Sequence, residues 1–192
     1  ISIGGNNKEE YLEVFRAIHS KVSSSSFSQF FYEINISCPN TDEGQSILQN
    51  PHLLDQLISD LRKKTDRLIS IKLSPDQSNE DILFMATIVE SHPRMMITMG
   101  NTTYRSCEEL GIPSNYISRG GGGLSGHPLL EDTLDRIERL SKVNVPIIAT
   151  GGISSISSVN AAMSKGASLV GMATALIQNP YNIVLINNKL RH

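Results

Sequence analysis

The sequence predicts an α/β fold built around a parallel β-sheet. Short apolar runs alternate with amphipathic segments of helical spacing, which is typical of β-α units. Polar residues gather just after the apolar runs, where α/β proteins place their sites. The 192 residues suffice for one domain or a large part of one. Periodicity leaves two arrangements open: an open doubly wound sheet, or about three quarters of a (β/α)8 barrel.

Six short apolar runs are expected to be strands. They cover residues 1–3, 30–36, 68–73, 95–99, 145–149 and 167–172. The second run has β-formers on both sides of Glu33, and Pro75 stops the third. The fifth run leads directly into a glycine pair at Gly151 and Gly152. Their short length and dense apolar content predict buried strands of a parallel sheet.

The segments between and after these strands predict helices. They cover residues 52–64, 78–91, 129–140, 155–165 and 179–190. The first has leucine and isoleucine near the i, i+3, i+4, i+7 spacing, Pro51 near its start and basic residues at its end. The second has acidic side chains in its first turn, and Gly166 stops the fourth. Two biased stretches, residues 23–28 and 120–123, are expected to be loops.

Composition excludes several classes of protein. The net charge is −2, from 17 Lys+Arg and 19 Asp+Glu, so a basic nucleic-acid-binding surface is not expected. No apolar run approaches the ~20 residues of a transmembrane helix. Two cysteines make no disulfide scaffold, and the histidines show no metal-ligand spacing, so no metal is expected. The chain starts at Ile1 inside a strand pattern, and we expect further sequence upstream.

The sharpest motif is residues 35–41, which follow the second strand. Asn35 and Asn40 supply two carboxamides that can hold a planar ligand, and Cys38 supplies a thiol that can act as a base or a nucleophile. The alternative is a capping loop with a small buried cysteine.

Lys72 lies inside the otherwise apolar third strand. A lysine in this position must pair with a carboxylate or point to a ligand at the strand end. The sequence leaves a structural salt bridge and a fixed positive charge beside a cofactor as alternatives.

Three turns close to the C-terminus, two of them rich in glycine and the third an Ala-Thr step, together indicate a phosphorylated ligand. They lie at residues 119–128, 150–152 and 173–174, and their backbone N–H groups can approach phosphate oxygens closely. Each turn alone is a weak signal. Asn101 and Thr102, read alone, indicate only a turn.

Taken together and in this order, six motifs carry a family resemblance: NISCPNT, IKLSPD, NTT, GGLSGHPL, IIATGGISS and GASLVGMATALI. Over about residues 1–180 they resemble the dihydroorotate dehydrogenases, FMN-dependent oxidoreductases of pyrimidine (UMP) biosynthesis. The resemblance implies that residues 1–192 are the C-terminal part of a single FMN-binding (β/α)8 TIM barrel, here N-terminally incomplete with about six β-α units. It implies oxidation of (S)-dihydroorotate to orotate.

The same motifs imply roles for individual residues. Cys38 would be the base that takes the C5 proton, while N5 of FMN takes the C6 hydride. Lys72 would lie against the flavin and stabilise the charge of its reduced form. The implied substrate contacts are Asn35, Asn40, Asn101 and Thr102. The other implied flavin contacts are Asn35, Gly126, Gly151, Gly152, Ala173 and Thr174.

The motifs combine features of two subclasses. Cys38 resembles the base of the soluble classes, whereas NTTYR and GGLSGHPL resemble the quinone-dependent class, in which a threonine is common where this chain has Gly100. The implied electron acceptor is therefore a quinone, fumarate or another acceptor, and the location cytoplasmic or peripheral on a membrane. A homodimer is also implied.

Two alternatives remain open. A phosphate-binding barrel lyase or isomerase explains the glycine turns but not NISCPNT. An inactive, truncated barrel fragment is the other, since we expect this chain alone neither to close a barrel nor to bind FMN well.

Overall fold

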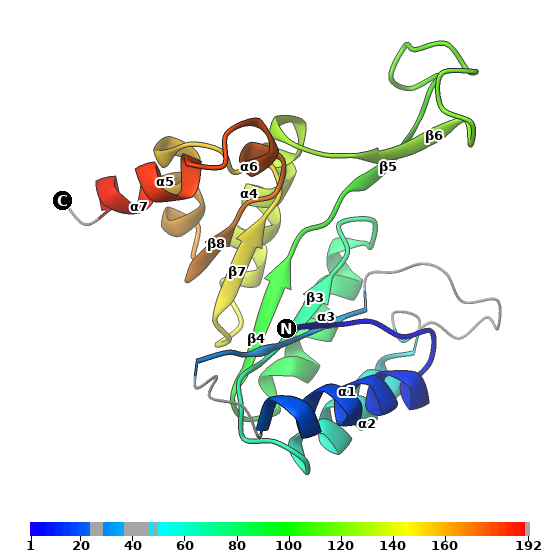
Figure 1. Cartoon of the computed structure of the whole chain (residues 1–192), viewed down its shortest axis with the longest axis vertical. Coiled ribbons are helices and arrows are strands. Elements are labelled where there is room, and N and C mark those ends of the chain that lie inside the picture. The colour runs from blue at the N-terminus through cyan, green and yellow to red at the C-terminus, as the bar shows by residue number, and fades with distance from the viewer. Residues whose placement is uncertain (24–28, 37–46, 48–49, 191–192) are drawn as a thin grey trace. The chain divides into compact units, whose positions relative to one another are not determined.

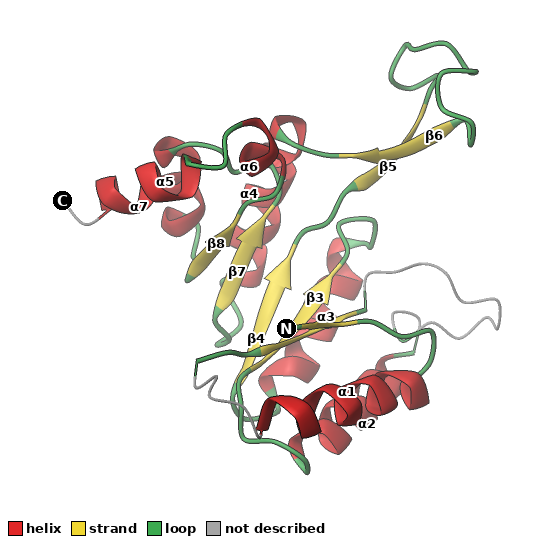
Figure 2. Cartoon of the chain, in the orientation of Figure 1, coloured by secondary structure: helices red, strands yellow, loops and turns green. Residues whose placement is uncertain are grey.

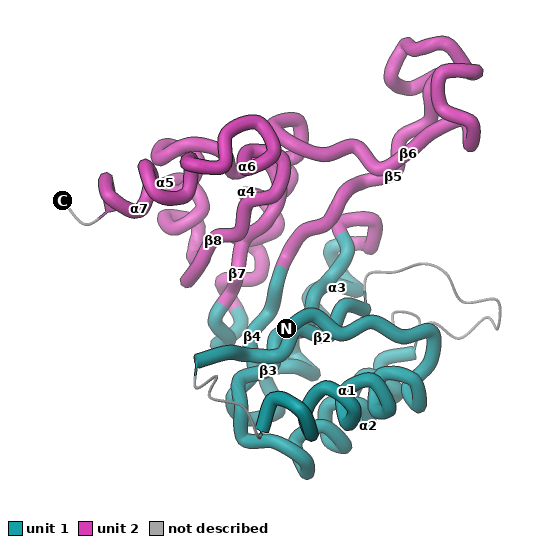
Figure 3. The backbone as a smooth tube through the Cα atoms, in the orientation of Figure 1, with its two compact units in different colours: residues 1–74, 79–98, 143–146 teal, residues 75–78, 99–142, 147–192 magenta. Residues whose placement is uncertain are grey.

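The structure is a computed structural model that describes residues 1–23, 29–36, 47 and 50–190. The chain divides into two compact units (Figure 3). Unit 1 consists of Ile1–Ser74, Asn79–Thr98 and Val143–Pro146. Unit 2 consists of Pro75–Ser78, Met99–Lys142 and Ile147–His192.

Unit 1 alternates strands and helices (Figure 1). In chain order they are β1 (Ser2–Ile3), α1 (Lys8–Ser23), β2 (Tyr32–Asn35), α2 (Pro51–Arg62), β3 (Ile69–Leu73), α3 (Asn79–Glu90) and most of β4 (Met95–Met99). Strands β1, β2 and β3 pair in parallel, and β4 follows β3 in the sheet. This is the β-α alternation that the sequence predicts.

One face of β2 and β3 forms the apolar core of unit 1. Tyr32 and Ile34 of β2 are fully buried, as are Ile69 and Ile71, their register partners on β3. The ring of Phe15 in α1 packs against the Tyr32 ring, with 4.9 Å between centroids. Side chains alternate between the two faces of a strand, so the residues between these buried ones point to the opposite face of the sheet.

The other face is polar. Ser2 Oγ donates a hydrogen bond of 3.0 Å to Glu33, the residue opposite it in the register of β1 and β2. Glu33 in turn lies opposite Ser70, whose hydroxyl is 2.7 Å from that of Thr98 on β4. A row of polar side chains therefore crosses the sheet below the strand ends.

Unit 2 contains a two-stranded ribbon and a second set of β-α elements (Figure 2). They are β5 (Thr103–Ser106), β6 (Gly121–Leu124), the 3-10 helix η1 (His127–Leu129), α4 (Leu130–Leu140), β7 (Ile147–Thr150), α5 (Ile156–Ser164), β8 (Leu169–Gly171), α6 (Thr174–Gln178) and α7 (Asn182–Leu190). Strands β7 and β8 pair in parallel, whereas β5 and β6 are antiparallel.

The six expected strands are all present and form the parallel sheet, with their ends displaced by a few residues. The expectation of a loop at residues 120–123 is wrong, because Gly121–Leu124 is strand β6. A Cβ on Gly121 would lie 2.5 Å from the Arg105 carbonyl oxygen, so the glycines let β6 approach β5 closely. Of the other expected loop, residues 24–28 lie outside the described residues.

Helices α1 and α6 are absent from the sequence-based expectations. Two hydrogen bonds cap the start of helix α1: Asn7 Oδ1 accepts from the Glu10 amide at 2.9 Å, and Glu10 Oε2 accepts from the Asn6 amide at 2.9 Å. No helix in the described part of the chain is long and apolar enough to cross a bilayer.

Candidate active site

Two of the expected site residues stand side by side in unit 1. Asn35 is the last residue of β2 and lies opposite Lys72, the fourth residue of β3, in the parallel register. Register partners of neighbouring strands project from the same face of a sheet. Asn35 and Lys72 therefore continue the polar face that Glu33 and Ser70 begin, at the carboxyl ends of the strands.

The Lys72 ammonium has no protein partner in the described part of the chain. The residue is half-buried, and no described carboxylate forms an ion pair with it. A half-buried charge without a partner costs free energy unless a ligand compensates it. Among the described residues, the structure thus gives no support to the salt-bridge alternative and leaves the charge available to a ligand.

The end of β2 is anchored to α1. The Tyr11 hydroxyl donates a hydrogen bond of 2.7 Å to the Asn35 carbonyl oxygen, and Tyr11 itself is buried. This bond fixes the backbone at the point where the chain leaves the strand toward residues 37–46, which lie outside the described residues. Cys38 and Asn40 are among those residues, so their predicted roles stay predictions.

In unit 2, the ends of β4 and β7 touch. The Thr150 hydroxyl donates to the Met99 carbonyl at 3.1 Å. Gly100 has φ +125°, and a Cβ there would collide with the Thr150 carbonyl oxygen. Only glycine fits this combination of backbone conformation and contact. The sequence showed Gly100 only as a departure from the family pattern; its position directly after a strand is the signal that could have indicated the contact.

Asn101 and Thr102 follow Gly100 and lead into the ribbon. The Asn101 side-chain oxygen accepts a hydrogen bond of 2.9 Å from the Thr102 amide, which orients the carboxamide. The Thr102 side chain packs on Gly123 of β6, where a Cβ would collide with it. The pair is thus more than an isolated turn, because it joins the end of β4 to the β5–β6 ribbon.

Two of the predicted phosphate turns meet in unit 2. Gly126 has φ +86°, and a Cβ there would lie 3.2 Å from the Thr174 methyl carbon. The Thr174 hydroxyl donates to the Ser125 hydroxyl at 3.2 Å. Ala173 immediately precedes Thr174 as the N-cap of α6. The turn after β6 and the turn after β8 therefore lie against each other.

The third turn packs on the start of α4. Gly152 has φ +73°, and a Cβ there would lie 2.5 Å from the Leu130 amide nitrogen. Gly151 has φ +113°, and its Cβ would lie 2.6 Å from the Thr133 hydroxyl. Both glycines are therefore needed because the turn packs directly against the start of α4, where a side chain at either position would collide.

The glycines at 120–123 take no part in this arrangement, because β6 is paired with β5. Every described candidate residue lies at the end of a strand or in the segment that follows one. Lys72 is the exception, because it is the last residue but one of β3. Asn35 and Lys72 belong to unit 1, and the others belong to unit 2: Asn101, Thr102, Gly126, Gly151, Gly152, Ala173 and Thr174. No group of three metal-ligating side chains occurs in the part of the chain that the structure describes.

Comparison with known proteins gives consistent matches. A family model described as dihydroorotate dehydrogenase matches residues 1–192. The chain is 34% identical over 182 residues to "Dihydroorotate dehydrogenase B (NAD(+)), catalytic subunit" of Halalkalibacterium halodurans, covering 94% of this chain and 57% of that protein. It is 31% identical over 202 residues to "Dihydroorotate dehydrogenase (quinone)" of Hamiltonella defensa, covering 98% of this chain and 58% of that protein.

Among solved structures, the crystal structure of DHODH from Eimeria tenella in complex with ferulenol matches with a TM-score of 0.68 and 24% identity. The match covers 83% of this chain and 48% of that one. It confirms the expected fold: the parallel strands and their helices form part of a (β/α)8 barrel. The chain spans somewhat more than half the length of the curated relatives it matches.

Proposed function

The chain belongs to the dihydroorotate dehydrogenase family, and from this premise we propose that the protein oxidises (S)-dihydroorotate to orotate in pyrimidine biosynthesis. The observation that carries the proposal is the pairing of Asn35 with Lys72 at the carboxyl ends of β2 and β3. A carboxamide and an ammonium that forms no ion pair with a described residue lie on one polar face, and this pair suits a planar, electron-rich ligand better than it suits a structural role.

The residues present fit FMN. Lys72 offers a positive charge to an electron-rich ring, and the turns at Gly126 and Gly152 have the positive φ angles of glycine turns whose backbone N–H groups can approach a phosphate. When bound, FMN would supply the hydride-accepting chemistry. We assign the flavin contacts to Asn35 and Lys72 together with Gly126, Gly151, Gly152, Ala173 and Thr174. In this assignment the Thr174 hydroxyl and the backbone of the glycine turns hold the phosphate group.

Cys38 is proposed to accept the proton from C5 of the substrate. The C5–H bond breaks, the proton goes to the sulfur, and its electron pair forms the new double bond as a hydride leaves C6. A thiol does this only as a thiolate, and cationic surroundings favour the thiolate. Cys38 follows Asn35 by three positions in the sequence, so the base and the substrate-positioning carboxamide come from one segment.

The substrate ring is proposed to be held by Asn35, Asn40, Asn101 and Thr102. Carboxamides both donate and accept hydrogen bonds, so they match the alternating N–H and C=O groups of a pyrimidine ring. The bond from the Thr102 amide sets the orientation of the Asn101 carboxamide before any ligand arrives. Their contribution is positioning, which brings the reacting atoms into line.

The test is made on the purified full-length gene product. We expect bound flavin and dihydroorotate-dependent reduction of a redox dye. The relatives' names differ in the electron acceptor, NAD(+) or a quinone, so each acceptor is then offered separately. A colourless protein that binds phosphate would favour a lyase or isomerase, and a protein without flavin or activity would favour an inactive barrel fragment. Either result overturns the proposal.

A further inference from the structure

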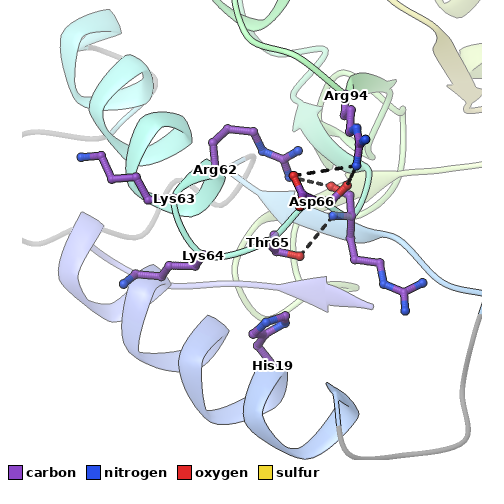
Figure 4. Close-up of a pocket in the computed structure, with 8 residues that line it drawn as sticks. His19, Arg62, Lys63, Lys64, Thr65, Asp66 and Arg94 are labelled. Atoms are coloured by element: carbon purple, nitrogen blue, oxygen red, sulfur yellow. Dashed lines mark hydrogen bonds and ion pairs between the residues drawn. The ribbon is translucent and has the colours of Figure 1, made fainter.

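A pocket in unit 1 lies away from the proposed active site. Its volume is about 600 Å³, and Figure 4 shows its lining. The lining residues are His19, Arg62, Lys63, Lys64, Thr65, Asp66, Arg67 and Arg94. Most of them lie on the segment that leads from α2 into β3, and Arg94 directly precedes β4. The pocket is therefore at the amino ends of β3 and β4, whereas Lys72 lies near the carboxyl end of β3.

The lining carries a strong local excess of positive charge. Two lysines, three arginines and one carboxylate, that of Asp66, line the pocket, although the chain as a whole has a net charge of −2. Lys63 is compensated by Asp60 at 3.0 Å. Lys64 forms no ion pair with a described residue. A concave surface lined by charges of one sign concentrates counter-ions, here anions.

The negative end of the α2 dipole explains only part of this cluster. Basic residues commonly follow the last turn of a helix because they compensate its dipole, and Arg62 and Lys63 fit that explanation. Arg67 and Arg94 do not, because they stand just before β3 and β4. Arg94 is moreover the only non-glycine residue with positive φ, at 57°, in the described part of the chain. An arginine is thus held there in a backbone conformation that costs free energy.

Two of the arginines, Arg62 and Arg94, are held in place by backbone carbonyls, and the Arg67 guanidinium lies 4.4 Å from the centre of the Phe30 ring. Arg62 Nη2 donates to the Arg67 carbonyl at 2.6 Å, and its Nε is buried without a hydrogen-bond partner among the described residues. Arg94 Nη1 donates to the Asp66 carbonyl at 2.8 Å and lies 3.8 Å from the Asp66 carboxylate, which is almost fully exposed. Figure 4 shows Arg62, Asp66 and Arg94 converging at one side of the pocket. Carbonyl contacts fix the Arg62 and Arg94 guanidinium groups, and the exposed Asp66 carboxylate compensates the Arg94 charge only weakly.

We propose that this pocket binds the oligophosphate group of a soluble small molecule, such as inorganic pyrophosphate or the diphosphate of a nucleotide. Arginine and lysine are the side chains that proteins use for phosphate, and two arginines, Arg62 and Arg94, converge at one side of this pocket, which two lysines and a third arginine also line. A volume of about 600 Å³ suits a ligand of nucleotide size. The proposal is independent of the proposed oxidation, because all lining residues lie outside the candidate active site.

The test uses the full-length protein and isothermal titration calorimetry with inorganic pyrophosphate at low salt. We expect saturable binding that weakens about tenfold or more in the variant Lys64→Gln/Arg94→Gln, because two unneutralised or weakly neutralised charges are lost. The matched control is Lys142→Gln, which removes one exposed charge at the end of α4 and should leave the affinity unchanged. ADP should bind and adenosine should not.

Three results would overturn the proposal. They are an absence of saturable pyrophosphate binding to the wild type, equal affinity of wild type and double variant, and equal loss in the Lys142→Gln control. If the variant that contains Arg94→Gln fails to fold, the single variant Lys64→Glu is tested instead, because position 64 is exposed. Its pyrophosphate affinity must then be lower than that of the wild type by at least the effect of losing one positive charge. Binding to phosphatidylserine vesicles without pyrophosphate binding would instead identify a lipid surface as the ligand and reject the small molecule.

Discussion

Asn35 of β2 and Lys72 of β3 are register partners, so a carboxamide and an ammonium emerge side by side from the same face of the parallel sheet. The hydrogen bond from Tyr11 to the Asn35 carbonyl fixes one of the two backbones, and the Lys72 charge has no described carboxylate partner. The proposed function depends on this arrangement, because the same two positions are assigned to flavin and substrate.

Replacing Lys72 by glutamine should remove bound flavin. The ammonium is proposed to complement the electron-rich edge of the flavin, and a neutral amide of similar length cannot. We expect the ratio of flavin absorbance to protein to fall at least severalfold, while Lys142→Gln retains its flavin. A Lys72→Gln protein with full flavin and unchanged turnover would show that the lysine is structural.

Thr174 should contribute to FMN binding through its hydroxyl group rather than through the volume of its side chain. Thr174→Val keeps the volume but loses the hydrogen bond to Ser125 and the proposed phosphate contact. We expect FMN affinity, measured by fluorescence quenching, to weaken about tenfold, as the loss of one hydrogen bond to a charged group predicts. Thr174→Ser should bind FMN nearly as wild type does. Equal affinity of Thr174→Val and Thr174→Ser would remove this residue from the site.

Gly100→Ala should destabilise the protein strongly. The position combines φ +125° with contact to the Thr150 carbonyl, so a methyl group adds backbone strain and a steric clash. We expect a loss of about 2–5 kcal/mol in the free energy of unfolding. The control is Gly122→Ala, where the nearest atom to a new Cβ is 3.9 Å away. Similar urea midpoints for the two variants would contradict the geometry at Gly100.

Asp60 should stabilise the fold in a pH-dependent way. Hydrogen bonds from Lys63 and Lys8 lower the pKa of the Asp60 carboxyl below its ordinary value of 3.8. Because the folded-state pKa is the lower one, the stabilisation is fully present above the unfolded-state pKa and is lost as pH falls through the folded-state value. The stability difference between wild type and Asp60→Asn should thus be below about 1 kcal/mol at neutral pH and vanish under strong acid. A difference that grows on acidification would contradict this assignment.

The sequence alone could predict the strands of the parallel sheet but not the ribbon. Strands such as β3 are short apolar runs, and burial on both sides makes that pattern visible. Strand β6 is Gly121–Leu124, and glycine has no β-propensity, so only its close approach to Arg105 explains the strand. Helix α1 did carry a local signal that went unused: its buried residues Tyr11, Leu12 and Phe15 have helical spacing, and the Asn7 side chain caps its start.

The site was predictable where it depends on local order along the chain. Asn35 and Lys72 each stand at or near a strand end, and adjacent parallel strands bring such positions together. The contact between Gly100 and Thr150 could not be predicted from the sequence, because it joins the ends of two strands that are far apart along the chain. The basic pocket was missed for the same reason, since Arg94 reaches it from a different connection than Arg62 and Arg67. The predicted roles of Cys38 and Asn40 remain to be tested by experiment.

The most direct test of the proposed chemistry is the rate at which dihydroorotate bleaches bound flavin in the full-length protein under anaerobic conditions. Wild type should bleach rapidly. Cys38→Ala should hold the same amount of flavin but bleach roughly 10²–10⁴ times more slowly, as the loss of a general base predicts. Bleaching at the wild-type rate in Cys38→Ala, or loss of flavin together with the rate, would contradict the assignment of Cys38 as the base.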